Sequence, residues 1–196
     1  MKSLILALLV LLGQSIASAI ETVEDVTVEV FHVAVSGGKS QPSEGSPKGV
    51  SVLRDRFDIV EKSLGIPLLK GHGLAVMFTL TGKYKHLESV RLVVKFPEMK
   101  APSGEVYSGI DRVQKSLVAD HDRVVAFSYA FDEEWELVEG IWTVQIFDGN
   151  QRLGEAQLIA YDPNKKQPNQ TPEPTTMLGT SAAEQPLVPS IVVAHL

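Results

Sequence analysis

The sequence predicts an all-β fold, an immunoglobulin-like antiparallel sandwich of about seven or eight strands. Several segments alternate apolar and polar residues with a period of two, which is the pattern of strands that have one wet face. Short runs rich in Gly, Pro, Asp and Asn separate these segments. The segments do not alternate with amphipathic helices, which argues against a parallel α/β fold.

An export signal is expected over residues 1–19. Lys2 precedes the apolar run Leu4–Leu12, and residues 17–19 have the small-x-small form that signal peptidase accepts. The run is shorter than the roughly 20 residues that span a bilayer. We therefore expect cleavage between Ala19 and Ile20, a mature chain without a membrane anchor, and a periplasmic or secreted location.

The first predicted strand covers residues 23–35. Its apolar set changes parity between Val30 and Phe31, which we interpret as a β-bulge. A polar loop rich in Gly and Pro is expected over 36–48. Residues 51–64 fit a strand or one face of a helix, and we favour the strand.

Two strands with clean alternation follow, over 74–80 and 90–96. Pro97 is expected to end the second strand because it lacks the N–H that a ladder needs. A loop is expected over 99–104, and residues 106–117 are only weakly patterned.

The last strands cover 124–131 and a hairpin over 142–161, with Asp148-Gly149-Asn150 at its turn. After Asp162 the composition changes to Pro, Gln, Asn, Thr and Ser, and neither period appears. The predicted organisation is a sandwich domain over 20–162 and a low-complexity, disordered tail over 163–196.

Composition excludes several functions. The chain has no Cys, which removes thiol nucleophiles and thiolate metal sites. Its formal net charge of −6 argues against nucleic acid as a partner. The five histidines show no metal-ligand spacing, so no cofactor or metal is expected. Residues 120–139 concentrate acidic side chains around a single base, Arg123, which favours a partner with a basic surface.

The candidate site lies in this acidic stretch. It is a surface cluster in which four acids surround one aromatic residue: Asp132, Glu133, Glu134, Trp135 and Glu136. One interpretation is that Trp135 and Trp142 anchor an inter-strand connection while the acids stay in water. Alternatively, paired carboxylates beside a Trp could bind or hydrolyse a glycoside, or the acids could hold Ca²⁺.

The order of motifs resembles a bacterial exported domain-of-unknown-function family, the one numbered 3859. The resemblance covers about residues 23–161 and rests on the following residues: Ile66-Pro67, Gly71 and Gly73, Phe96-Pro97, Phe131-Asp132, Trp135-Glu136-Leu137-Val138, Gly140, Trp142-Thr143, Asp148-Gly149 and Leu153. Leu74 stands where an aromatic residue is expected. The resemblance implies an exported β-rich domain and brings no activity and no functional residues.

From the residues and the resemblance together, we expect a non-enzymatic binding or interaction module whose partner is an envelope or extracellular protein. A fold hosts many functions, so this expectation is an analogy at the level of the fold. The alternative is a carbohydrate-binding or glycoside-hydrolysing domain that uses the cluster at Asp132–Glu136.

Overall fold

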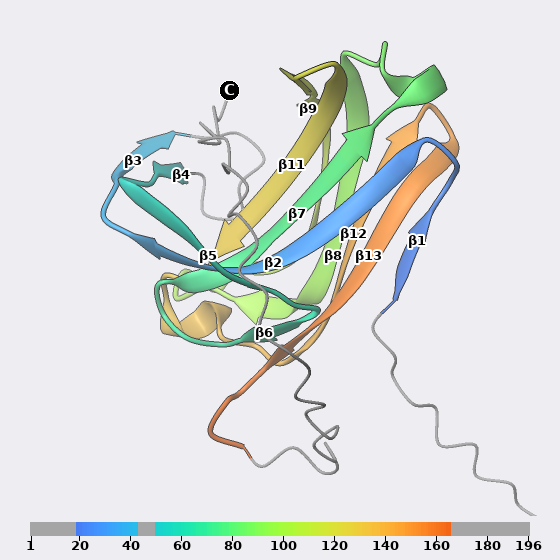
Figure 1. The fold of residues 1–196 in the computed structure, drawn as a ribbon. Helices are drawn as coiled ribbons and strands as arrows, with labels where there is room; N and C mark the ends of the chain where they lie inside the picture. Colours follow the sequence, from blue (N-terminus) through green and yellow to red (C-terminus); the bar gives the residue numbers. More distant parts are fainter. Residues whose placement is uncertain (1–18, 43–49, 166–196) are drawn as a thin grey trace, which may run out of the picture.

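The computed structural model describes residues 19–42 and 50–165. Within these ranges the chain forms two large β-sheets packed face to face and one small two-stranded sheet (Figure 1). The predicted immunoglobulin-like sandwich class is therefore confirmed. The predicted signal over 1–19, apart from Ala19, and nearly all of the predicted tail lie outside the described residues. No helix in the described part is long and apolar enough to cross a membrane.

The first sheet has the strand order β1-β13-β12-β8-β9. Its strands are β1 (Ile20–Thr22), β13 (Gln151–Tyr161), β12 (Gly140–Asp148), β8 (Ser89–Lys100) and β9 (Val106–Lys115). A short strand, β6 (Gly65–Pro67), pairs with β13 in parallel, so this sheet is not entirely antiparallel. The predicted hairpin over 142–161 is confirmed as β12 and β13.

The second sheet has the order β10-β11-β7-β2-β5. Its strands are β10 (Leu117–Ala119), β11 (Asp122–Ala130), β7 (His72–Leu80), β2 (Val26–Ser36) and β5 (Arg56–Lys62). A separate hairpin pairs β3 (Lys39–Pro42) with β4 (Val50–Leu53), so part of the predicted loop over 36–48 is a strand. The strand favoured over a helix for 51–64 is confirmed.

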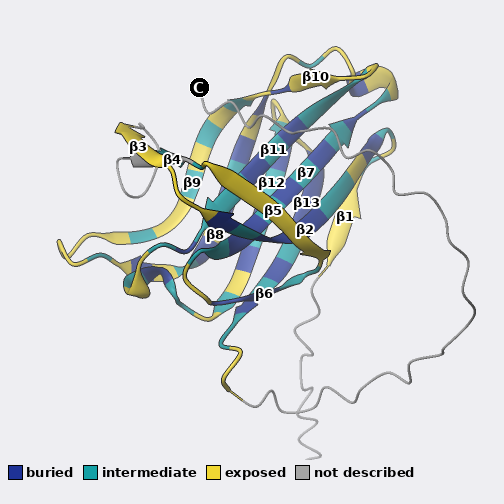
Figure 2. Cartoon of the chain, turned by 60° about the vertical axis from the view of Figure 1, so that its left-hand side comes forward, coloured by how far each residue is buried: buried dark blue, intermediate teal, exposed yellow. Residues whose placement is uncertain are grey.

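The core lies between the two sheets and is built from the alternating residues that the sequence pattern singled out. Figure 2 shows buried and more exposed positions alternating along the central strands. Leu74, Val76, Phe78 and Leu80 of β7 are all fully buried. They meet the apolar face of the opposite sheet: Val90, Leu92, Val94, Trp142, Val144 and Ile146.

The predicted β-bulge is not the reason why the apolar side chains of β2 change face between Val30 and Phe31. The pairing of β2 with β7 runs without interruption from Val26 to Ala34. Val26 and Val30 point into the core, whereas Phe31, Val33 and Val35 form a separate apolar cluster with neighbours such as Met77. A register shift occurs only against β5, between His32 and Val33. Both faces of β2 thus carry apolar side chains.

The sequence predicted that Pro97 ends its strand, and this prediction is wrong. The N–H that proline lacks would fall where the pairing changes register. The pairing of β8 with β9 shifts between Lys95 and Met99, and β8 continues to Lys100. A bulge of this kind tolerates proline since no ladder hydrogen bond is needed there. The predicted loop over 99–104 is reduced to the turn after Lys100. Strand β8 contacts the segment that follows β11.

Strand β9 forms one edge of the first sheet. Arg112 on β9 pairs with Leu92, which is fully buried in the core. Its guanidinium therefore lies on the core side of an edge strand, and its Nε atom is buried without a hydrogen-bond partner among the described residues. Burial lowers the pKa of Arg112.

Candidate functional site

The segment of residues 131–139 connects β11 of the second sheet to β12 of the first. Phe131 is fully buried and packs against Trp142, with 6.0 Å between ring centroids. The next residues form a short 3-10 helix, η2 (Glu134–Glu136), which lies against β8. The buried aromatic pair thus fixes the segment at one end of the sandwich, as the anchoring interpretation predicted for Trp142.

Glu136 is fully buried, and the prediction that the acids of this cluster all stay in water is wrong for it. Its carboxylate accepts three hydrogen bonds: one at 2.5 Å from the Tyr129 hydroxyl, and two at 2.8 Å from the backbone N–H groups of Asp132 and Glu133. The contact to Glu133 is the back-reaching half of a capping box. Burial and this carboxylate raise the pKa of Tyr129 far above its ordinary value. Glu136 therefore holds the segment in shape.

Two further acids of the cluster pair with basic side chains. Asp132 accepts a hydrogen bond from Arg54, which lies 78 positions earlier in the chain, and both side chains are largely buried. Glu134 is exposed and lies 3.2 Å from Lys70 Nζ. The structure thus brings the predicted residues together but directs their carboxylates to different partners.

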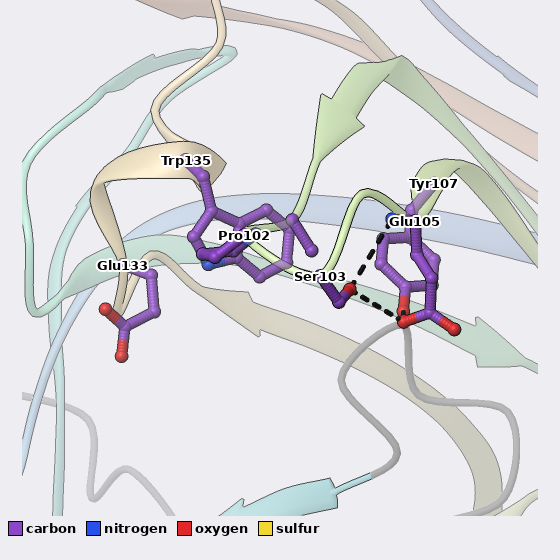
Figure 3. Close-up of a pocket in the computed structure, with 7 residues that line it drawn as sticks. Pro102, Ser103, Glu105, Tyr107, Glu133 and Trp135 are labelled. Carbon is purple, nitrogen blue, oxygen red and sulfur yellow. Dashed lines mark hydrogen bonds between the residues drawn. The ribbon is translucent and has the colours of Figure 1, made fainter.

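Trp135 is half-buried and lines a surface pocket of about 450 Å³ (Figure 3). The other lining residues come from the 101–107 turn and from the start of η2: Ala101, Pro102, Ser103, Glu105, Tyr107 and Glu133. The rings of Trp135 and Tyr107 lie 6.1 Å apart between centroids. The sequence indicated Trp135 and Glu133 but not the 101–107 side, because those residues lie far from the acidic run in the chain and meet it only in the folded structure.

One carboxylate of the pocket is fixed by neighbouring hydroxyls. Glu105 Oε2 accepts hydrogen bonds from the Tyr107 hydroxyl at 2.7 Å and from Ser103 Oγ at 3.1 Å (Figure 3). The bond from Tyr107, followed by that from Ser103, lowers the pKa of Glu105. The same bond raises the pKa of Tyr107. The pocket therefore presents a carboxylate that stays negatively charged beside two aromatic rings.

A pair of histidines, which the sequence did not indicate, lies near the same end of the sandwich. His32 Nε2 and His72 Nδ1 are 2.8 Å apart, and their rings stack with 5.1 Å between centroids. His32 is buried, and burial together with His72 lowers its pKa, whereas nearby Glu61 acts in the opposite direction. Among the described residues, no three His, Cys, Asp or Glu side chains form a group that could hold a metal ion.

The comparisons with known proteins add a likeness of fold. No protein-family model matches the chain, and the search of curated proteins found no similar sequence. A crystal structure of an immunoglobulin-like protein from Pseudomonas aeruginosa matches 73% of this chain and 97% of its own, with 20% sequence identity and a TM-score of 0.47.

Proposed function

We propose that the chain is a non-enzymatic interaction module that works outside the cytoplasm and binds an envelope or extracellular protein with a basic surface. The observation that carries the proposal is the division of roles within Asp132–Glu136. The carboxylates of Asp132 and Glu136 hold the segment in place. Trp135 lines an open pocket whose carboxylates come from Glu105 and Glu133.

The contacts of these acids favour binding over hydrolysis. A glycosidase needs one carboxylic acid with a raised pKa and a second carboxylate at a matched separation. Glu136 accepts hydrogen bonds from three donors, and Asp132 is paired with Arg54. Glu105 has a lowered pKa, which is opposite to what a general acid needs.

The proposed location rests on the predicted export signal, which lies outside the described residues apart from Ala19. Strand β1 begins at Ile20, the first residue of the predicted mature chain. We expect the protein recovered from the periplasm or the medium to start at Ile20, as measured by mass spectrometry of its N-terminal peptide. An intact Met1 in the cytoplasmic fraction would contradict the proposal. Membership of the family numbered 3859 also stays a prediction.

Site-specific photo-crosslinking in living cells tests the interaction. A photoreactive residue replaces Ser103 at the pocket, and the same residue replaces Asn150 in the β12–β13 turn as a matched control. We expect one defined crosslinked protein from position 103 and none from position 150. Absence of any crosslink at position 103, together with release of sugar from a chromogenic glycoside, would support the carbohydrate alternative and overturn the proposal.

A further inference from the structure

We propose that the pocket between η2 and the 101–107 turn binds a cationic side chain, a lysine or an arginine, that projects from the basic partner. This inference rests on the proposed function and names the chemistry of its partner. It starts from the pocket itself, whose volume of about 450 Å³ lies within the range of small-molecule sites. Figure 3 shows Glu133 on one side of the Trp135 indole and Glu105 with Tyr107 on the other.

The aromatic side chains give the pocket one attraction for a cation. An ammonium or guanidinium group over the face of Trp or Tyr is attracted by the ring quadrupole. Trp135 is half-buried against the core and Tyr107 packs beside it, so both rings are held while they line the pocket. The carbon stem of a lysine or arginine side chain can pack on the same rings.

The charged side chains give the second attraction. Among the described residues, those that line the pocket include two carboxylates, of Glu105 and Glu133, and no basic side chain. Glu105 is held in place by hydrogen bonds from Ser103 and Tyr107 and carries a negative charge at neutral pH. A cation that enters between these acids meets an aromatic face and fixed negative charge together.

The same contacts argue against a neutral sugar. Sugar hydroxyls need both donors and acceptors in the site that binds them. The hydroxyl protons of Ser103 and Tyr107 already point to Glu105, so the Trp135 indole N–H is the side-chain donor left among the described lining residues, beside the carboxylate oxygens of Glu105 and Glu133. An ammonium or guanidinium group carries donors only, which matches this arrangement.

Fluorescence titration of the purified full-length protein tests the inference, with acetylated, amidated pentalysine as the probe. Trp135 lines the pocket and Trp142 is buried, so a change in emission reports mainly on Trp135. The double variant Glu105→Gln/Glu133→Gln keeps the side-chain shapes and removes both charges. We expect it to weaken pentalysine binding by roughly two- to thirtyfold, which is the scale of two exposed ion pairs.

A second double variant, Asp120→Asn/Asp122→Asn, is the matched control. It removes one carboxylate from the turn between β10 and β11 and one from the first residue of β11, and asparagine tolerates the positive φ of 55° at Asp120. We expect it to change pentalysine affinity less than about twofold. The Trp135→Leu variant lacks the reporting indole, so its affinity is measured by isothermal titration calorimetry beside the wild type; binding should weaken by about two- to fivefold, as expected for an exposed cation–π contact.

Equal affinity of pentalysine for the wild type and the Glu105→Gln/Glu133→Gln variant would overturn the inference. An oligosaccharide that changes Trp135 emission where pentalysine does not would overturn it as well. These failures are distinguishable from failure of the proposed function. If only the cationic-ligand inference fails, a defined protein still crosslinks at position 103, and the proposed interaction module stands without the cationic ligand.

Discussion

Replacement of Glu136 tests whether a buried carboxylate holds the candidate site together. Glu136→Ala removes the acceptor from the Tyr129 hydroxyl and from the backbone N–H groups of Asp132 and Glu133. With a net value of about 1 kcal/mol for each of the three bonds, the free energy of unfolding should fall by about 3 kcal/mol. Water that enters the vacated space limits the loss, since both N–H groups lie near the surface.

Glu136→Gln separates the loss of charge from the loss of the acceptor. The amide oxygen can accept from the two backbone N–H groups, and the amide N–H can donate to the Tyr129 hydroxyl, which turns to accept it. Only the assistance from the charge is lost, so we expect a loss of about 1 kcal/mol. The exposed Glu134→Ala serves as the control and should stay within about 0.5 kcal/mol of the wild type.

Urea denaturation followed by tryptophan fluorescence measures all three variants, on the assumption of a two-state transition with an unchanged m value. We expect the largest loss of unfolding free energy for Glu136→Ala, a smaller loss for Glu136→Gln and the smallest for the Glu134→Ala control. If Glu136→Ala lies within about 0.5 kcal/mol of the wild type, the hydrogen bonds of this carboxylate do not stabilise the segment.

Three further predictions concern buried groups away from the pocket. Burial and His72 lower the pKa of His32, so the folded state favours the neutral imidazole. The contribution of this group to the free energy of unfolding is complete above the ordinary histidine pKa of about 6.5. It is lost as the pH falls through the lower pKa of the folded state. NMR titration should give His32 a midpoint below the ordinary histidine value of about 6.5, and a midpoint at or above that value would contradict this. Gly73→Ala should lower the melting temperature, with a loss of about 1–3 kcal/mol, because an added Cβ would lie 2.0 Å from the Tyr129 carbonyl oxygen; an unchanged melt would show that the strands separate easily there. Trp142→Phe should lower the free energy of unfolding by less than the roughly 3–5 kcal/mol expected for Trp142→Ala. The Phe variant keeps a ring and removes an Nε1 donor that has no partner among the described residues. Equal losses for the two variants in urea unfolding would refute this.

Period-two alternation predicted the strands that have one buried and one wet face, and it did so because burial of one face requires that pattern. It failed where both faces carry apolar residues, as at Val30 and Phe31 of β2. The expectation that Pro97 ends its strand failed for another reason, since the sequence does not show that β8 and β9 change register there.

The candidate site was predicted in part. The acids and Trp135 were found because they are neighbours in the sequence, whereas their roles depend on contacts that form only in the folded chain. Arg54 lies 78 positions from Asp132, and only the folded chain brings the two together. Tyr129 and Glu136 are close in sequence, yet nothing in the pattern of a polar run indicates that one of its carboxylates is buried.

The inward-facing Arg112 on β9 has a consequence for how copies of this domain behave when crowded. An edge strand offers its unpaired backbone groups to any passing chain, and edge-to-edge addition is a route to fibrils. A strand added alongside β9 would cover a guanidinium whose Nε already lacks a partner among the described residues. Because desolvation of a cation is costly, we expect Arg112 to disfavour the addition of a further strand along this edge.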